Sequence, residues 1–178
     1  NKVKSYGKKI VAGGPLFTLS PDRFQEVDHL VLQEAEATLP ALIEELDKGK
    51  GKQIYATTEW PDLSSSPIPE WSLLDISKYA VMTVQYSRGC PFDCEFCDIA
   101  LLNGKRIRTK TPTQILSELE ALYQRGWRSV IFFGDDNFIG KPRYLKEELL
   151  PALIKWMEKK DIPSLFWPKP LSTSQTTN

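Results

Sequence analysis

All three cysteines of this 178-residue chain lie within one stretch of eight positions. Cys90, Cys94 and Cys97 follow the pattern C-x-x-x-C-x-x-C, and Phe96 stands directly before the last of them. Cysteine thiolates are the usual protein ligands of iron–sulfur clusters, so three of them this close can hold three corners of a cubic four-iron cluster. Because the sequence contains no fourth cysteine, one iron would keep an open position, which is what catalysis at a metal requires.

Two simpler interpretations of the cysteines stand beside the cluster. Three structural cysteines can share a loop by chance, although the crowding of every cysteine into one loop argues against chance. A structural zinc site usually takes four ligands in paired C-x-x-C or Cys/His spacings. The single histidine, His29, lies in a different segment, so zinc would need an unusual ligand set. The pattern therefore favours an iron–sulfur cluster.

The cysteine stretch resembles the signature of the radical S-adenosylmethionine (SAM) enzymes, and residues 85–92 resemble the subgroup with an N-terminal cobalamin-binding domain, which includes hopanoid-type methylases. The resemblance implies that Cys90, Cys94 and Cys97 ligate a [4Fe-4S] cluster, whose open iron is chelated by the amino and carboxylate groups of SAM. An electron from the cluster then splits the sulfonium and yields a 5′-deoxyadenosyl radical. Phe96 is expected to lie beside the adenine.

Two further segments are assigned to SAM by the same resemblance. Gly134, Asp135 and Asp136 follow a strand-like run and resemble the family's Gly-Gly-Glu motif, which holds the amino group of SAM; hydrogen-bond acceptors at this place suit an ammonium donor. The alternative is that polar residues here cap a turn. Arg108 resembles a family arginine that faces the anionic part of SAM or substrate, and the alternative is a solvated basic loop over residues 104–110.

Composition limits the class of protein. The chain carries 23 basic and 23 acidic residues, and 41% of its residues are hydrophobic, which is typical of a soluble globular protein without the basic surface of a nucleic-acid binder. Its apolar runs are too short to span a bilayer, and residues 1–9 do not have the pattern of a signal peptide. Clustered cysteines without an export signal indicate a reducing compartment, so we expect a cytoplasmic protein without a transmembrane segment.

The first part of the chain reads as strand, helix, strand, helix, which is an α/β pattern. The strands are expected near residues 9–12 and 28–32, a short helix over 21–27 between them, and a longer helix opened by 38–40. This segment resembles the last part of a Rossmann-like cobalamin-binding domain. Gly13 and Gly14 match the glycine pair that approaches the corrin or its nucleotide tail, although a glycine pair without this resemblance would indicate an ordinary tight turn. Gln33 stands where the family usually has glycine.

The elements around the cysteines form a second pattern. A strand over 79–86 leads directly into the cysteine loop, a capping box at Thr111 begins a helix, and a buried strand follows at 129–133. These elements make one βαβ unit with the loop at the carboxyl end of its first strand, where α/β folds bind ligands. A second helix over 144–159, kinked at Pro151, and a further strand over 162–167 are expected after it.

The predicted domains are the end of the cobalamin-binding domain at 1–51, a linker at 52–78, the first part of the radical SAM barrel at 79–170 and a disordered tail at 171–178. The fold class is therefore α/β, a partial (β/α) barrel preceded by the end of a Rossmann-like domain, in a truncated piece of a larger enzyme. Because the piece holds few strand ends, we expect it to bind cobalamin weakly or not at all.

The resemblance implies cobalamin-dependent methylation of an unactivated carbon. Its expected cofactors are a [4Fe-4S] cluster, SAM and, in the full-length family, cobalamin. Its expected partners are a small-molecule or lipid-like substrate and an electron donor such as flavodoxin or ferredoxin, with no nucleic acid. The alternatives are a cobalamin-dependent radical cyclase or rearrangement enzyme, and a non-catalytic fragment that binds an iron–sulfur cluster or zinc.

Overall fold

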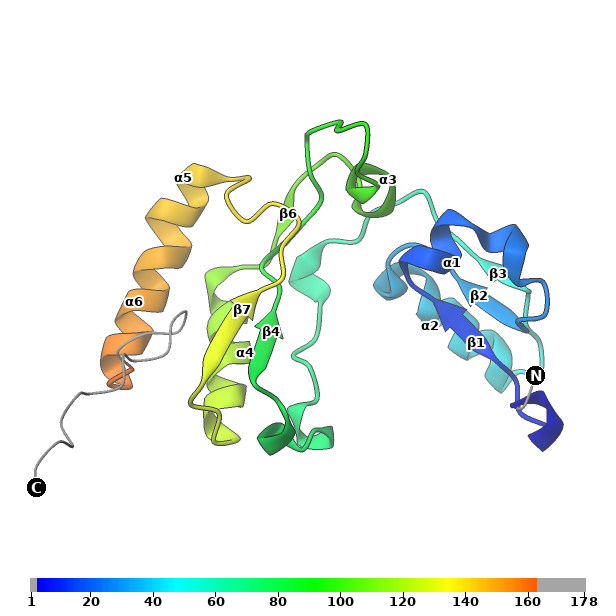
Figure 1. Cartoon of the computed structure of the whole chain (residues 1–178), viewed down its shortest axis with the longest axis horizontal. Helices are drawn as coiled ribbons and strands as arrows, with labels where there is room; N and C mark the ends of the chain where they lie inside the picture. Colours follow the sequence, from blue (N-terminus) through cyan, green and yellow to red (C-terminus); the bar gives the residue numbers. More distant parts are fainter. Residues whose placement is uncertain (1–2, 163–178) are drawn as a thin grey trace, which may run out of the picture. The chain divides into compact units, whose positions relative to one another are not determined.

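The computed structural model describes residues 3–162 (Figure 1). Within this range the chain divides into two compact units. The first comprises the residues up to Ser65 together with Gly89–Arg106, and the second comprises Ser66–Arg88 and the residues from Ile107 onward. The predicted strand over 163–167 and the predicted tail at 171–178 lie outside the described residues.

The first unit is built on a parallel sheet of three strands in the order β1-β2-β3. Its elements are β1 Val11–Gly13, α1 Pro15–Leu19, a 3₁₀ turn Pro21–Phe24, β2 His29–Val31, α2 Ala35–Asp47, β3 Ile54–Tyr55 and, in the cysteine segment, α3 Ile99–Asn103. The central strand β2 is buried along its whole length, as expected for a strand that is covered on both faces.

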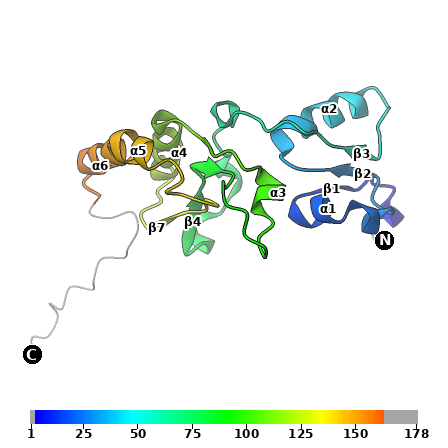
Figure 2. The same ribbon diagram turned by 90° about the horizontal axis from the view of Figure 1, so that it is seen from above.

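Two helices cover opposite faces of this sheet (Figure 2). On one face Leu30 packs with Phe17 of α1 and Phe24 of the 3₁₀ turn. On the other face Val31 packs against Leu42 of α2. Alternate residues of β2 thus point to opposite layers, which is the side-chain period of a strand. The α/β prediction for this segment is confirmed.

The predicted start of α2 is too late in the chain. The helix begins at Ala35 rather than at Thr38, and Thr38 is buried inside its first turns. The Thr38 Oγ1 atom lies 3.3 Å from the carbonyl oxygens of both Leu32 and Glu34. A threonine hydroxyl that donates to a preceding carbonyl is compatible with a helix interior, and Pro40 is accommodated nearby without ending the helix. Helix α1 and strand β3 are additional to the predicted elements.

The second unit contains the predicted βαβ unit. Strands β4 and β7 pair in parallel from Val81↔Val130 to Val84↔Phe133, and helix α4 connects them. A two-stranded antiparallel pair, β5 with β6, precedes the helix. The bounds of these elements are β4 Val81–Val84, β5 Ser87–Arg88, β6 Arg108–Thr109, α4 Pro112–Gln124 and β7 Val130–Phe133.

Helix α4 begins as the sequence predicts. Thr111 Oγ1 accepts a hydrogen bond from the amide of Gln114 at 3.2 Å, and the Gln114 side chain accepts one from the Thr111 amide at 2.9 Å, which together form a capping box. The helix is followed by Gly126 at φ +93°. Its buried residues Ile115, Leu119 and Leu122 pack on the β4–β7 sheet.

The last helical segment changes its winding before Pro151. It consists of α5 Pro142–Tyr144, a π-helical turn Leu145–Leu149 and α6 Leu150–Lys159. Proline has no amide hydrogen to donate, so a wider turn directly before Pro151 is a reasonable local solution. Leu145, Leu149 and Leu153 complete the core of this unit.

The opposite face of the β4–β7 sheet is less covered. Val81 is 43% exposed and Phe132 is 59% exposed. Within residues 3–162 the sheets have three, two and two strands and none closes into a barrel. The part of the chain that the structure describes also has no helix with the length and apolar character needed to cross a membrane.

Candidate functional site

The loop that carries the cysteines is closed at its base by two glycines. The amide of Cys90 donates to the carbonyl oxygen of Gly104 at 3.1 Å, which joins the two ends of the loop. Gly89 lies at φ +91°, and a Cβ there would come within 2.5 Å of the Arg106 carbonyl oxygen. Gly104 lies at φ +77°, and a Cβ there would meet the indole of Trp60 at 2.8 Å. Only glycine fits both positions.

None of the three cysteines forms a disulfide, and two of them are open to solvent. Cys94 and Cys97 are exposed, and Cys90 is partly buried. The amide of Cys97 donates to the Cys94 carbonyl oxygen at 3.0 Å, which makes a tight turn between these two. Phe96, within this turn, is 91% exposed. Exposed thiols on one short loop are accessible to a cluster, and an exposed ring beside them can accept a stacked base.

The types and number of the available ligands suit a cluster better than a single ion. A mononuclear zinc site needs four ligands around one centre, whereas each cysteine of a four-iron cluster binds a different iron. Three cysteines that form no disulfide, with no fourth cysteine in the sequence, match a ligand set that leaves one iron of such a cluster open.

The end of β7 carries the segment predicted to bind the SAM amino group. The amide of Gly134 donates to the Val84 carbonyl oxygen at 2.9 Å and extends the pairing with β4 by one bond. The next residue, Asp135, accepts from the amide and hydroxyl of Ser87 at Oδ1 and from the amide of Tyr86 at Oδ2. Asp136 is partly buried.

The environment of Asp135 raises the pKa of its side-chain carboxyl. Burial raises the pKa of this carboxyl above its ordinary value, and the hydrogen bonds from Ser87 and Tyr86 offset only part of the shift. The negative charge of Asp136 raises the pKa further. A partly desolvated carboxylate that accepts three hydrogen bonds goes beyond the sequence prediction, which indicated only acceptors at a strand end.

Arg108 lies in a short strand and not in a loop. It is part of β6 and stands opposite Arg88 of β5 in the antiparallel pair. Arg88 is oriented by its Nε atom, which donates to Oε1 of Gln85 at 2.8 Å. The expectation of a solvated basic loop over 104–110 is therefore wrong at Arg108 and at Lys110, whose side chain is buried.

The predicted cobalamin residues follow β1. A Cβ on Gly13 would lie 2.7 Å from the Val31 carbonyl oxygen, so the glycine allows β1 and β2 to approach closely. Gly14 has φ +95° and nothing within 4 Å of its Cβ position. At the end of β2, Gln33 adopts φ +59°, a left-handed conformation that favours glycine. Two features therefore define the backbone at these strand ends: the close approach of Gly13 to Val31 and the positive φ angles of Gly14 and Gln33.

Gln33 is held in this conformation from two directions. Its amide donates to Thr18 Oγ1 at 2.9 Å, and its side-chain oxygen accepts from the amide of Thr57 at 3.1 Å. These bonds join the segments that follow β1, β2 and β3. The sequence gives one sign of this left-handed conformation, because glutamine stands where the family that the chain resembles usually has glycine.

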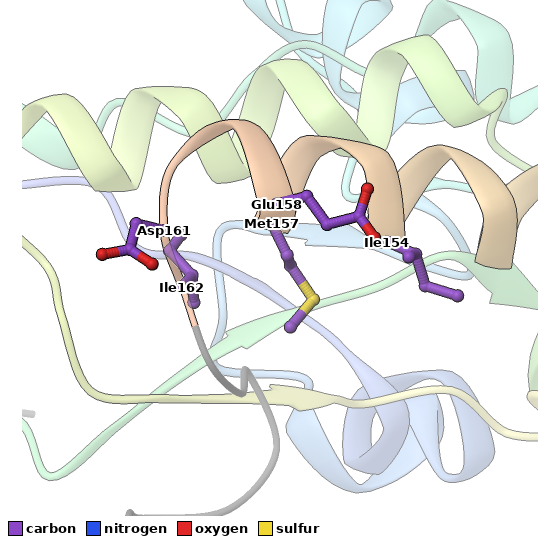
Figure 3. Close-up of a pocket in the computed structure, with 5 residues that line it drawn as sticks. All are labelled: Ile154, Met157, Glu158, Asp161 and Ile162. Atoms are coloured by element: carbon purple, nitrogen blue, oxygen red, sulfur yellow. The ribbon is translucent and has the colours of Figure 1, made fainter.

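One hollow of about 340 Å³ lies at the end of α6 (Figure 3). It is lined by Ile154, Met157, Glu158, Asp161 and Ile162. None of the residues predicted to bind a cofactor lines it, so this hollow is separate from the candidate site.

The predicted residues are distributed over both units. Gly13, Gly14, Phe96 and the three cysteines belong to the first, and Arg108, Gly134, Asp135 and Asp136 belong to the second. Within the second unit, the structure brings Asp135 to Ser87, two residues before the cysteine segment begins with Gly89 and Cys90.

Comparison with known proteins identifies the family of the second half of the chain. The profile of the radical SAM superfamily matches residues 84–164. An uncharacterized methyltransferase of Synechocystis sp. is 46% identical over 167 residues, covering 93% of this chain and 31% of that protein. The hopanoid C-2 methylase of Rhodopseudomonas palustris is 38% identical, covering 84% of this chain and 29% of that protein.

Other matches agree with these. The bacteriochlorophyllide d C-12(1)-methyltransferase of Chlorobaculum tepidum is 27% identical over 87% of this chain and 36% of its own length. Among solved structures, the cobalamin-dependent SAM radical enzyme OxsB with aqua-cobalamin bound has a TM-score of 0.68 at 23% identity, covering 89% of this chain and 26% of that one. This likeness shows the fold. The chain spans about a third of the length of these curated relatives.

Proposed function

We propose that this chain, whose residues 84–164 match the radical SAM superfamily, reductively cleaves SAM at a [4Fe-4S] cluster bound by Cys90, Cys94 and Cys97. The observation that carries the proposal is the loop itself. It carries three cysteines that form no disulfide, its ends are joined by the hydrogen bond between Cys90 and Gly104, and the sequence contains no fourth cysteine. When bound, the cluster supplies the electron that splits SAM into methionine and a 5′-deoxyadenosyl radical.

The other residues position SAM in this proposal. The exposed ring of Phe96 provides a face for the adenine, because an aromatic ring stacks on a base without regard to its hydrogen-bonding edge. The segment Gly134–Asp136 supplies acceptors for the amino group, since an ammonium removed from water needs hydrogen-bonded partners. Arg108 faces an anionic group of SAM or substrate.

We further propose that the complete protein is a cobalamin-dependent methyltransferase acting on a small-molecule or lipid-like substrate. Several relatives are methyltransferases by name, and the solved structure with the same fold has cobalamin bound. The strand ends at Gly13, Gly14 and Gln33 are the place for cobalamin, because Rossmann-like folds bind ligands at the carboxyl ends of their strands. The electron comes from a carrier such as flavodoxin or ferredoxin.

The test is release of 5′-deoxyadenosine from SAM with dithionite under strict anaerobiosis. We expect slow release by the parent chain without a methylated product, and loss of release in Cys94→Ala. Glu95→Gln is the matched control, because Glu95 is an exposed residue of the same loop with no proposed role. A parent that binds a cluster but releases no more than Cys94→Ala would identify a non-catalytic iron–sulfur fragment.

A further inference from the structure

The backbone pairing of β4 with β7 ends before the cysteine segment. The last paired residues are Val84 and Phe133, and one further bond runs from the Gly134 amide to the Val84 carbonyl oxygen. The chain that continues from β4 through Tyr86 and Ser87 lies beyond this last backbone bond. Both of these residues are buried, so their amides need acceptors inside the protein.

Beyond the last backbone bond between β4 and β7, the Asp135 side chain supplies the hydrogen-bond acceptors. The carboxylate of Asp135 accepts from the Tyr86 amide at 3.3 Å, from the Ser87 amide, and from the Ser87 hydroxyl at 2.6 Å. The Ser87 hydroxyl has a second acceptor in the Asn137 carbonyl oxygen at 3.3 Å. Three donors from two consecutive residues thus meet one carboxylate at the end of β7. Hydrogen bonds to a charged acceptor are the stronger kind.

The same segment is also held by β6. Ser87 and Arg88 pair with Thr109 and Arg108, and the Lys110 amide donates to the Tyr86 carbonyl oxygen at 2.8 Å. Residues 86–88 therefore have partners from β6 and from Asp135. Cys90 follows only two residues later in the chain.

We propose that Asp135 is a positioning residue that fixes residues 86–88 and, through them, the start of the cysteine loop. Its carboxylate continues the β4–β7 pairing with a side chain after the backbone bonds end. The relevance to catalysis rests on the proposed function, because it assumes that the loop holds the cluster. This narrows the role proposed above for the segment Gly134–Asp136, because the side-chain contact with the SAM amino group then belongs to Asp136 and not to Asp135.

The experiment compares Asp135→Asn with Asp136→Asn in the full chain. In Asp135→Asn an NH₂ group replaces one carboxylate oxygen and places donors against the donors of Tyr86 or Ser87, whereas Asp136 takes no part in the bonds described above. The first readout is hydrogen exchange of the Tyr86 and Ser87 amides without iron. We expect exchange to rise at least tenfold in Asp135→Asn and to stay at the parent rate in Asp136→Asn.

The second readout is iron per chain after anaerobic reconstitution, followed by SAM affinity. We expect Asp135→Asn to lower the iron content at least twofold, and Asp136→Asn to keep the iron but bind SAM at least tenfold more weakly. Parent-like exchange and iron in Asp135→Asn, combined with weak SAM binding, would overturn the proposal and make Asp135 a SAM ligand.

A second variant and the measurement on iron-free protein decide the role of Asp135 even if Asp135→Asn does not fold or the parent takes up no iron. If Asp135→Asn does not fold, Ser87→Ala removes only the two bonds of the hydroxyl, to Asp135 and to the Asn137 carbonyl oxygen. A rise of at least twofold in exchange at the two amides is then expected; an unchanged rate would overturn the positioning role. A parent chain that takes up no iron would defeat the proposed function, whereas the exchange measurement on iron-free protein would still decide what Asp135 does.

Discussion

Replacing Gly89 by alanine tests whether the base of the cysteine loop is as tightly specified as the structure indicates. An L-residue at φ +91° costs about 1–2 kcal/mol of backbone strain. The added Cβ would also lie 2.5 Å from the Arg106 carbonyl oxygen, and relieving such a backbone contact costs about a further 1–3 kcal/mol. We therefore expect Gly89→Ala to destabilise the protein by about 2–5 kcal/mol.

Gly126→Ala is the matched control for this change. Gly126 has nearly the same dihedral, φ +93°, but nothing lies within 4 Å of its Cβ position. The control therefore reports the backbone strain alone, about 1–2 kcal/mol. The assay is urea unfolding of both variants together with iron content after anaerobic reconstitution.

The two readouts separate strain from the effect on the loop. Gly89→Ala is expected to lose more stability than Gly126→Ala and also to lose iron, because the shift of the backbone at Gly89 disturbs the bond between Cys90 and Gly104. Gly126→Ala is expected to keep its iron. Equal destabilisation by the two variants, with full iron in Gly89→Ala, would refute the conclusion that the loop base requires glycine.

Three other predictions concern the rest of the chain. Lys110 and Glu118 form a buried ion pair with side chains 7% and 3% exposed. Lys110→Met alone should therefore lower the free energy of unfolding in urea by about 3–5 kcal/mol, because it leaves Glu118 buried without its partner, whereas Lys110→Met combined with Glu118→Leu should lower it far less. Equal losses in the two variants would contradict this. The hydrogen bond from Lys160 is the main cause that lowers the pKa of Glu120 from 4.5 to about 2, so the ionised Glu120 stabilises the protein above pH 4.5 and loses this effect as the pH falls towards 2. The free energies of unfolding of the parent and of Glu120→Gln should therefore differ above pH 4.5 and converge towards pH 2. A difference that stays constant over this range would argue against the contact. Hydroxocobalamin titrated into the chain should bind weakly or not at all, because Rossmann-like sites use several strand ends and the described sheet has three strands; a tight one-to-one complex would disprove this.

The parts of the fold that follow from local chemistry were predictable from the sequence. The capping box at Thr111, the apolar stripe of the following helix and the apolar strand after it give the βαβ unit, since each depends on residues close in sequence. The prediction that this strand is buried is wrong: only Ile131 of β7 is buried, and Phe132 is 59% exposed. The cysteine spacing predicts a cluster-binding loop, because the ligands of a cluster must lie close together; this assignment stays a prediction.

The parts that depend on distant contacts were not predictable. Asp135 accepts hydrogen bonds from donors 48 and 49 positions earlier in the chain, and no periodic pattern encodes such a bond. The requirement for glycine at position 104 comes from Trp60, which the sequence placed only in a linker. The short pair β5–β6 has two residues per strand, too few for an alternating pattern to be recognised.

Gln33 shows how a departure from a family pattern becomes informative once the backbone is known. A glutamine at φ +59° is strained where glycine would not be. Its hydrogen bonds to Thr18 and Thr57 offset this strain. The sequence identified the unusual residue, but its physical reason lies in contacts with two other segments.

The most direct test of the central claim is the iron and sulfide content of the chain after anaerobic reconstitution. The three cysteines of the loop predict about four irons and four sulfides per chain, with visible charge-transfer absorption. A variant with alanine at Cys90, Cys94 and Cys97 should take up neither. Stoichiometric zinc without that absorption in the parent, or equal iron in the variant, would contradict an iron–sulfur cluster at this loop.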